Sequence, residues 1–208
     1  MSIDLSELVS PSHTAVLTME VQRAVIGDLS TIPELADAAR RTAVIPNIAR
    51  VLAAARPLSI PVIHCLAAFR ADRAGTTVNC ALIGSVVRNP AHMLTGSPEA
   101  ELVPELGPEP GDLVSTRFHG VSPFIGTSVD PWLRSLGVRT VVATGVSLNL
   151  GVLGLAIEAV NFGYRVVVPR DTVTGVPADY ADALLANTFP MICTLTTTDD
   201  LLGAWGGR

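Results

Sequence analysis

The sequence contains no lysine, because all 14 of its basic residues are arginines. Schiff-base catalysis, a lysine general base and a phosphate-binding P-loop lysine are therefore excluded. Cysteine is also scarce: Cys65, Cys80 and Cys193 are the only three, and no two of them have C-x-x-C spacing. A disulfide framework or a zinc site is not expected, and the low cysteine content fits the reducing cytoplasm.

Runs of like charge and long apolar runs are missing as well. Only 16% of the residues are charged and the formal net charge is −5, which argues against nucleic-acid binding because phosphate contacts need clustered basic residues. The apolar runs fall short of the ~20 residues that cross a bilayer. Residues 1–12 have neither a basic start nor an apolar centre, so we interpret them as a leader to the domain rather than a secretion signal. With nucleic acid and membrane not indicated, a small molecule is the expected partner.

What is present is a 208-residue chain, 49% hydrophobic, in which short apolar runs alternate with helical patterns. The length suits one domain over 1–208. Strands are expected at 13–19, 60–66, 112–117, 139–146, 164–169 and 191–196. Alternation with helices implies crossover connections, so we predict an α/β three-layer sandwich with a six-stranded parallel sheet, a Rossmann-like architecture.

Three segments between the strands have distinctive patterns. Helical spacing over 34–57 is interrupted by Pro46, which predicts a bend or two helices. The Pro- and Gly-rich segment 89–111 is expected to be a surface excursion with at most one short helix. The segment 148–163 is almost entirely apolar and is therefore predicted to be a buried helix.

Ligand sites in parallel α/β sheets lie beyond the carboxyl ends of the strands. This rule selects Glu20 after the first strand and Arg117 after the third. Separately, each would be read as a surface charge. We expect the ends of the first and third strands to lie side by side, so that the two side chains form an ion pair in one cleft.

A third element follows the fourth strand, in the sequence GVSLNLGVLGLAIEA (145–159). Ser147 or Asn149 is placed to cap the next helix, and Gly151 lies in its first turn. Backbone N–H groups and the positive end of the helix dipole meet there, so the backbone of Ser147, Leu148, Asn149, Leu150 and Gly151 is a candidate cradle for a carboxylate or an oxyanion. No G-x-G-x-x-G follows the first strand, so dinucleotide binding is not indicated.

These stretches resemble the isochorismatase-like, or cysteine hydrolase, superfamily. The resemblance rests on AVLTMEVQ (15–22), on residues 116–171 and on the turn that contains Asp171, and it is most specific over 122–163. It implies a six-stranded parallel α/β sandwich, usually oligomeric. It also implies a site with an acid after strand one, a lysine after strand three and a cysteine in the helix after strand four.

At those positions this sequence holds Glu20, Arg117 and Gly151, so the resemblance implies that the nucleophilic cysteine is absent. True isochorismatases in the family are similar in having glycine there, and they cleave a vinyl ether by acid catalysis without a covalent step. Glu20 would be the acid, although a neighbouring arginine favours the ionised carboxylate. A substrate carboxylate that takes Arg117 would relieve this conflict.

Other residues extend the candidate site. Phe69 and His119 are predicted to line the pocket, and Asp171 is interpreted as orienting a loop. Some family members bind a metal in the loop after strand two, but here that loop offers Asp72 without His-x-x-x-His spacing, so neither a metal nor a cofactor is expected. Cys65 beside His64 is conceivable as a displaced nucleophile, but adjacent strand residues point to opposite faces, which favours a buried structural thiol.

Three hypotheses remain open at this point. The favoured one is a small-molecule hydrolase that uses Glu20, Arg117 and the turn at Gly151 without a covalent cysteine. The second is a non-catalytic family member that kept the fold as a binding or scaffold protein. The third is a hydrolase that uses Cys65. The apolar segment 148–163 further suggests a homo-oligomer.

Overall fold

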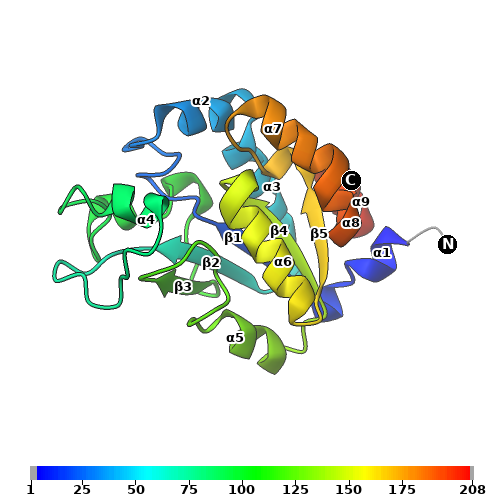
Figure 1. Cartoon of the computed structure of the whole chain (residues 1–208). Coiled ribbons are helices and arrows are strands. Elements are labelled where there is room, and N and C mark those ends of the chain that lie inside the picture. Colours follow the sequence, from blue (N-terminus) through cyan, green and yellow to red (C-terminus); the bar gives the residue numbers. More distant parts are fainter. Residues whose placement is uncertain (1–3, 207–208) are drawn as a thin grey trace.

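The computed structural model describes residues 4–206, and its centre is a sheet of six parallel strands (Figure 1). The strand order is β3-β2-β1-β4-β5-β6. The predicted α/β fold is confirmed, and the order reverses its direction between β1 and β4. The strands are β1 (Thr14–Met19), β2 (Val62–Ala67), β3 (Leu113–Arg117), β4 (Thr140–Gly145), β5 (Arg165–Pro169) and β6 (Thr194–Thr196).

Helices connect the strands and cover both faces of the sheet. The α-helices are α1 (Leu5–Leu8), α2 (Pro33–Arg41), α3 (Val44–Ala55), α4 (Ala81–Val86), α5 (Val129–Ser135), α6 (Leu153–Asn161), α7 (Ala178–Ala183), α8 (Phe189–Ile192) and α9 (Thr198–Ala204). Single π-helical turns, η5 (Leu148–Val152) and η7 (Leu184–Thr188), precede α6 and α8, and short 3₁₀ turns are η1 (Pro11–His13), η2 (Arg56–Leu58), η3 (Pro98–Ala100), η4 (Pro104–Leu106) and η6 (Arg170–Thr172). None of the helices in residues 4–206 is long and apolar enough to cross a membrane.

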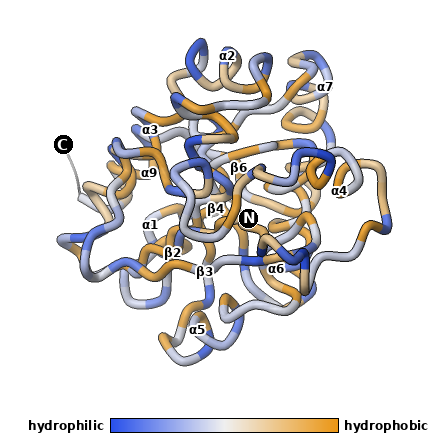
Figure 2. The backbone as a smooth tube through the Cα atoms, turned by 90° about the vertical axis from the view of Figure 1, so that its left-hand side faces the viewer, coloured by the Kyte–Doolittle hydropathy of each residue, from blue (hydrophilic) through white to orange (hydrophobic). Residues whose placement is uncertain are grey.

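Two hydrophobic cores lie on the two faces of the sheet. Alternate residues of the central strands point to opposite sides, so Val16 and Val62 pack with α2, α3 and α9, whereas Leu17 and Ile63 pack with α5, α6 and α7. All residues of β1, β2 and β4 are buried, as expected for strands covered on both faces. Figure 2 shows the hydrophobic residues concentrated along the inner strands and helices.

Two predicted helical segments differ in detail from the expectation. The break in 34–57 occurs at Ala43, which has a left-handed backbone (φ 52°), so that Pro46 lies in the first turn of α3. The apolar helix after β4 is not buried throughout, because Leu150, Ile157 and Val160 are exposed. Its first turn is π-helical, a geometry that is frequent at functional sites.

The segment 89–111, expected as a surface excursion, contributes to the core. Its only helices are η3 and η4, and Met93, Leu102, Val103 and Leu106 are buried against α3 and the end of β1. Apolar side chains spaced along an irregular Pro-rich segment give no periodic signal, so their burial could not be read from the pattern. The leader forms α1 and η1 over its described part; residues 1–3 lie outside the described residues.

A chain of buried polar groups joins the strands on the α3 side. The Nδ1 atom of His64 is 2.8 Å from the Oγ1 atom of Thr18, and its Nε2 atom is 3.3 Å from Asp112 Oδ2. Asp112 also accepts a hydrogen bond from Arg56 at 2.7 Å. Burial lowers the pKa of His64 despite the carboxylate beside it, so the imidazole is neutral at pH 7.

This network predicts sensitivity to acid. In the unfolded chain His64 gains its proton near its ordinary pKa of about 6.5, whereas in the folded protein it does so only at lower pH. The unfolded state therefore binds more protons between those two values, and the free energy of unfolding falls as the pH drops below about 6.5. Urea unfolding from pH 8 to 5 should show a shallower decline in His64→Gln than in wild type, and an unchanged decline in His119→Gln; equal slopes in all three would contradict the assignment.

Gly145 at the end of β4 determines how closely β1 and β4 approach each other. It has φ 103°, and a Cβ atom there would lie 2.2 Å from the carbonyl oxygen of Met19. Only glycine fits, because both the backbone conformation and the space exclude a side chain.

We expect Gly145→Ala to lower the free energy of unfolding by more than about 3 kcal/mol, because left-handed strain and a backbone clash act together. Gly163→Ala is a matched control, since Gly163 has φ 91° but no atom within 4 Å of the added Cβ. It should cost only the strain, about 1–2 kcal/mol. Chemical denaturation measures the free energy of unfolding of both variants. Equal losses would show that the close approach of the Met19 backbone does not destabilise Gly145→Ala.

Candidate active site

A cavity of about 240 Å³ lies at the carboxyl ends of the central strands, where the strand order reverses. Glu20, Arg117 and the turn at Gly151 all line it. Its other walls come from the segment after β1, from the ends of β2 and β3, from α4 and from Val176. The lining residues are Glu20, Ala24, Val25, Thr31, Ile32, Leu35, Ala67, Phe69, Leu82, Ile83, Val86, His92, Met93, Arg117, Gly120, Val121, Ser147, Asn149, Leu150, Gly151 and Val176.

Glu20 is the first residue after β1 and has a left-handed backbone with φ 49°. Its N–H still donates to the carbonyl of Cys65 at 2.9 Å, so the strand ladder continues up to this residue. A non-glycine residue in this conformation is strained, and such strain concentrates at functional sites. The side chain is 21% exposed and forms part of the cavity wall.

Arg117 ends β3 and reaches Glu20, although the strands are not neighbours. β2 lies between β1 and β3, which corrects the expected side-by-side placement of the first and third strands. The pair still forms: Arg117 Nη2 lies 2.5 Å from Glu20 Oε1, and Nε donates to the carbonyl of Gly120 at 3.2 Å. Between the two strand ends, β2 finishes at the small residue Ala67, which is followed by Ala68.

The Arg117 guanidinium is incompletely paired. Its side chain is only 6% exposed, and Nη1 is buried with no hydrogen-bond partner among the residues that the structure describes. A buried donor without an acceptor is costly, so an acceptor supplied by a ligand is the simplest way to satisfy it.

Gln22 holds the cavity wall together and was not singled out by the sequence. Its fully buried side chain donates to the carbonyls of Ala67 (2.8 Å) and Ala100 (2.7 Å) and accepts from Ala67 N–H at 2.8 Å. One amide thereby joins the end of β2 to the segment before η4. Because Ala67 pairs with Arg117 in the sheet, Gln22 is a positioning residue for the ion pair.

The turn after β4 brings Gly151 against the end of β1. A Cβ atom at Gly151 would lie 2.8 Å from Met19 Cε and 3.0 Å from the carbonyl oxygen of Val146. The Met19 side chain, which is completely buried, therefore occupies the space into which a side chain at position 151 would project. The glycine is part of a packed arrangement at the cavity floor.

The predicted cradle is present in part. Ser147, Asn149 and Leu150 line the cavity, and the helix that starts at Leu148 points its amino end toward it. Leu148 does not line it: its side chain is buried in the core, and its N–H donates to the carbonyl of Thr174 at 2.8 Å. No side chain caps the helix; the Ser147 hydroxyl instead bonds the Asn149 side chain.

The remaining predicted residues have separate positions. Phe69 lines the cavity, as expected. His119 does not, because it faces the loop after β2, where its Nδ1 atom accepts from Thr77 N–H at 3.4 Å. Asp171 accepts from Thr198 N–H at 2.9 Å and so holds the start of α9, which agrees with an orienting role.

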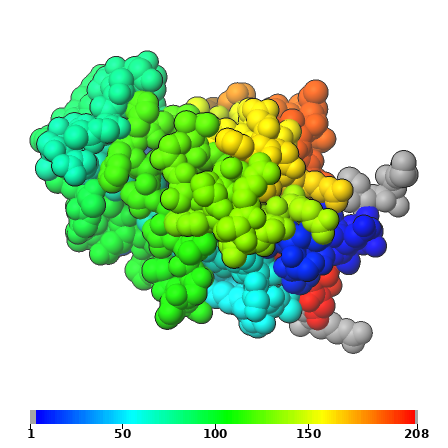
Figure 3. Space-filling view, turned by 90° about the horizontal axis from the view of Figure 1, so that it is seen from below, coloured from blue at the N-terminus to red at the C-terminus, as the bar shows by residue number. Residues whose placement is uncertain are grey.

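Most of the apolar wall could not be predicted from the sequence. Three side chains of α4, namely Leu82, Ile83 and Val86, face the cavity together with His92. They follow β2 along the chain, and Figure 3 shows this turquoise-to-green region gathered at one end of the molecule. Their convergence on Glu20 is a long-range feature that local patterns do not encode.

None of the three cysteines lines the cavity. Cys65 is buried within β2, and burial raises its pKa to about 12, with Arg117 opposing this shift weakly. Burial raises the pKa of Cys193 to about 12 as well. Cys80 is exposed just before α4 rather than inside a helix. Among residues 4–206, no cluster of three or more His, Cys, Asp or Glu side chains is placed to hold a metal ion.

These thiols should react very differently with iodoacetamide. Because the thiolate is the reactive form, Cys80 should be alkylated in the native protein at pH 8, whereas Cys65 and Cys193 should react only after unfolding in guanidinium. Peptide mass spectrometry at several times measures all three together. Native alkylation of Cys65 as fast as that of Cys80 would revive the hypothesis of a Cys65 nucleophile.

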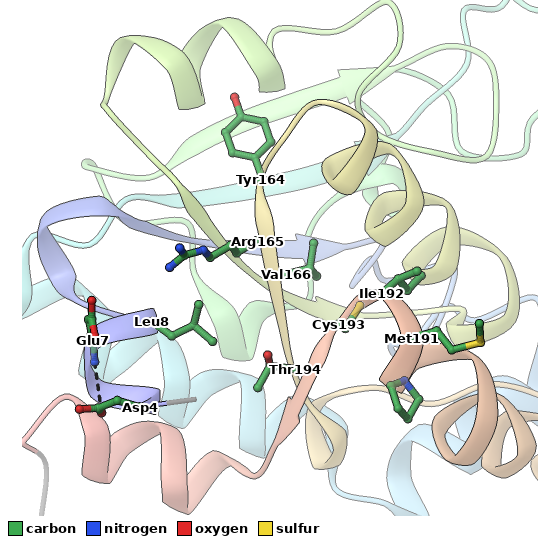
Figure 4. A pocket seen from close by; sticks show the side chains of 11 residues that line it. Asp4, Glu7, Leu8, Tyr164, Arg165, Val166, Met191, Ile192, Cys193 and Thr194 are labelled. Atoms are coloured by element: carbon green, nitrogen blue, oxygen red, sulfur yellow. Dashed lines mark hydrogen bonds between the residues drawn. The ribbon is translucent and has the colours of Figure 1, made fainter. Parts of the chain in front are cut away.

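A larger groove, of about 620 Å³, lies at the amino ends of the strands, opposite to the cavity. Figure 4 shows it bordered by Asp4, which caps α1, by Glu7 of α1, by Arg165 at the start of β5, and by Met191 and Cys193. It lies at the amino ends of β5 and β6, away from the reversal of strand order, and its thiol is protonated at neutral pH. The smaller cavity is therefore the better candidate for chemistry.

Comparisons with known proteins agree with this geometry. The model of the isochorismatase domain family matches residues 14–200. The chain belongs to the isochorismatase family, a family of small-molecule hydrolases. This confirms the resemblance inferred from the strand ends and the turn at Gly151.

Individual relatives span different shares of the chain. The ureidoacrylate amidohydrolase RutB of Pseudomonas savastanoi pv. phaseolicola is 30% identical, with 91% of this chain and 82% of that protein covered. The uncharacterised isochorismatase family protein YwoC of Bacillus subtilis is 35% identical over 50% of this chain, and the match spans only 54% of YwoC. Among solved structures, an isochorismatase family protein from Burkholderia thailandensis has a TM-score of 0.77 at 27% identity, covering 94% of this chain and 96% of that one.

Proposed function

We propose that this protein hydrolyses a small molecule by acid–base catalysis without a covalent cysteine, and that its substrate is a vinyl ether. The observation that carries the proposal is the Glu20–Arg117 pair at a cavity from which all three cysteines are absent. The relatives named as amidohydrolases belong to the same family, but the residues here suit a reaction that needs an acid and water only.

The reaction can be written with the residues present. An enol ether of pyruvate, R–O–C(=CH₂)–COO⁻, reacts with water to give the alcohol R–OH and pyruvate. The Glu20 carboxyl group donates a proton to the CH₂ carbon, and the positive charge is shared with the ether oxygen. Water then adds to the central carbon and gives its proton to the Glu20 carboxylate, after which the hemiketal collapses to pyruvate and alcohol.

Arg117 has two roles in this sequence. Before substrate binds, it pairs with the Glu20 carboxyl group through the 2.5 Å contact. A substrate carboxylate then competes for the guanidinium and pairs with it, since arginine binds carboxylates through two parallel N–H groups. Released from the cation, the Glu20 carboxyl group is available to the CH₂ carbon of the substrate.

The turn at Gly151 supplies the floor of this site. The Met19 side chain is packed where a side chain at position 151 would lie, so in this structure the helix presents no nucleophile to the cavity. The amino end of that helix stabilises the developing alkoxide.

Pyruvate release tests the proposal. Purified protein is incubated with isochorismate and with 2-(cyclohexyloxy)acrylate, the enolpyruvyl ether of cyclohexanol. We expect turnover of one of them by wild type and a loss of kcat of about 100-fold or more in Glu20→Gln. Glu34→Gln, an exposed carboxylate outside the cavity, is the matched control and should retain wild-type rates.

Unchanged turnover in Glu20→Gln would remove Glu20 as the acid. The alternative function, a non-catalytic binding or scaffold protein, is supported by the closed ion pair and predicts ligand binding without pyruvate release from either ether.

Exposed Leu150, Ile157 and Val160 on one helix further support the proposal of a homo-oligomer.

A further inference from the structure

The walls of the active-site cavity are mostly apolar, and its polar side chains besides Glu20 and Arg117 are Thr31, His92, Ser147 and Asn149. Apart from Glu20 and Arg117, its surface is formed mainly by aliphatic side chains, six of which lie in two segments: Val25, Ile32 and Leu35 after β1, and Leu82, Ile83 and Val86 on α4. Aliphatic walls lower the free energy of a bound apolar group and offer nothing to a polar one.

Charge in the cavity is balanced before any ligand enters. Glu20 and Arg117 are the only charged side chains that line it within residues 4–206, and they neutralise each other. His92 is the remaining titratable group; burial, together with the nearby Arg73 cation, lowers its pKa, so it is neutral at pH 7. A ligand with several charges would meet one cation only.

That cation has capacity for one acceptor group. Arg117 uses Nη2 for Glu20 and Nε for Gly120, which leaves the buried Nη1 without a partner among the described residues. One carboxylate that replaces Glu20 at Nη2 and also accepts from Nη1 satisfies this donor, whereas a second carboxylate on the same ligand would meet no further cation.

We propose that the substrate is a small monoanion: one carboxylate, which binds Arg117, on an uncharged apolar body, which packs between α4 and the segment after β1. This specificity rests on the proposed function. Together with the vinyl-ether reaction, it makes the substrate the enolpyruvyl ether of an apolar alcohol. The volume of about 240 Å³ lies below the ~300–1,000 Å³ typical of pockets for drug-sized ligands, so the body is about the size of one six-membered ring.

Binding of two stable probes tests this specificity without turnover. Isothermal titration calorimetry measures benzoate, a monoanion with an apolar ring, and isophthalate, which adds a second carboxylate to the same ring. We expect wild type to bind benzoate about ten-fold or more tightly than isophthalate, because the added charge has no partner. Arg117→Met should weaken benzoate binding about ten-fold or more.

A matched pair of variants tests whether the preference for benzoate over isophthalate arises in the cavity. Leu82 lines it and is 42% exposed, whereas Leu136 at the end of α5 is 46% exposed and lies outside it. Leu82→Arg supplies a second cation and should reduce the benzoate-to-isophthalate ratio about ten-fold; Leu136→Arg should leave it unchanged. A wild-type ratio near one, a preference for isophthalate, or no benzoate binding at millimolar concentration would overturn the proposal.

The vinyl-ether reaction and the monoanion specificity can be rejected independently of each other. Preference for benzoate together with no pyruvate release from 2-(cyclohexyloxy)acrylate would support the specificity and reject the vinyl-ether reaction. Pyruvate release from isochorismate with tight isophthalate binding would support the reaction and reject the specificity.

Discussion

The Glu20–Arg117 ion pair is the contact on which the rest of the site depends. It joins the ends of β1 and β3 across the intervening β2, and it lies beside the point where the strand order reverses. Between the two strand ends, β2 finishes at Ala67, whose backbone is held by Gln22. Sheet order, small residues and one buried amide together place a carboxylate and a guanidinium in one cavity.

Close packing on the other side of β1 completes the site. Gly145 allows β4 to approach the backbone of Met19, and Gly151 allows the next helix to approach its side chain. The same strand end thus presents Glu20 to the cavity and fills the space beneath Gly151. In the proposed acid–base chemistry, methionine fills the floor of the site and the reacting groups are Glu20 and Arg117.

Much of the fold could be predicted from the sequence because the strands are short apolar runs with helices between them. The strand-end rule also selected Glu20, Arg117 and Gly151, which line the cavity, and Phe69, expected separately, lines it as well. Adjacency in the sheet could not be predicted, since the position of β2 depends on crossovers rather than on local pattern.

The direction of individual side chains was harder to predict from the sequence than the fold. His119 follows Arg117 directly in the sequence, yet it turns to the loop at Thr77, and Leu148 turns into the core. Position near a strand end does not determine which way a side chain points. The apolar wall was missed for a related reason: the residues of α4 and of the segment after β1 form one surface only after the chain has folded.

A double-mutant cycle on pyruvate release shows whether Glu20 and Arg117 act as one unit. The cycle compares kcat/KM for wild type, Glu20→Gln, Arg117→Met and the double variant. Residues that act as a unit have strongly non-additive effects, so the double variant should be little slower than the slower single variant. Losses that multiply would contradict this coupling and show that the two residues contribute independently.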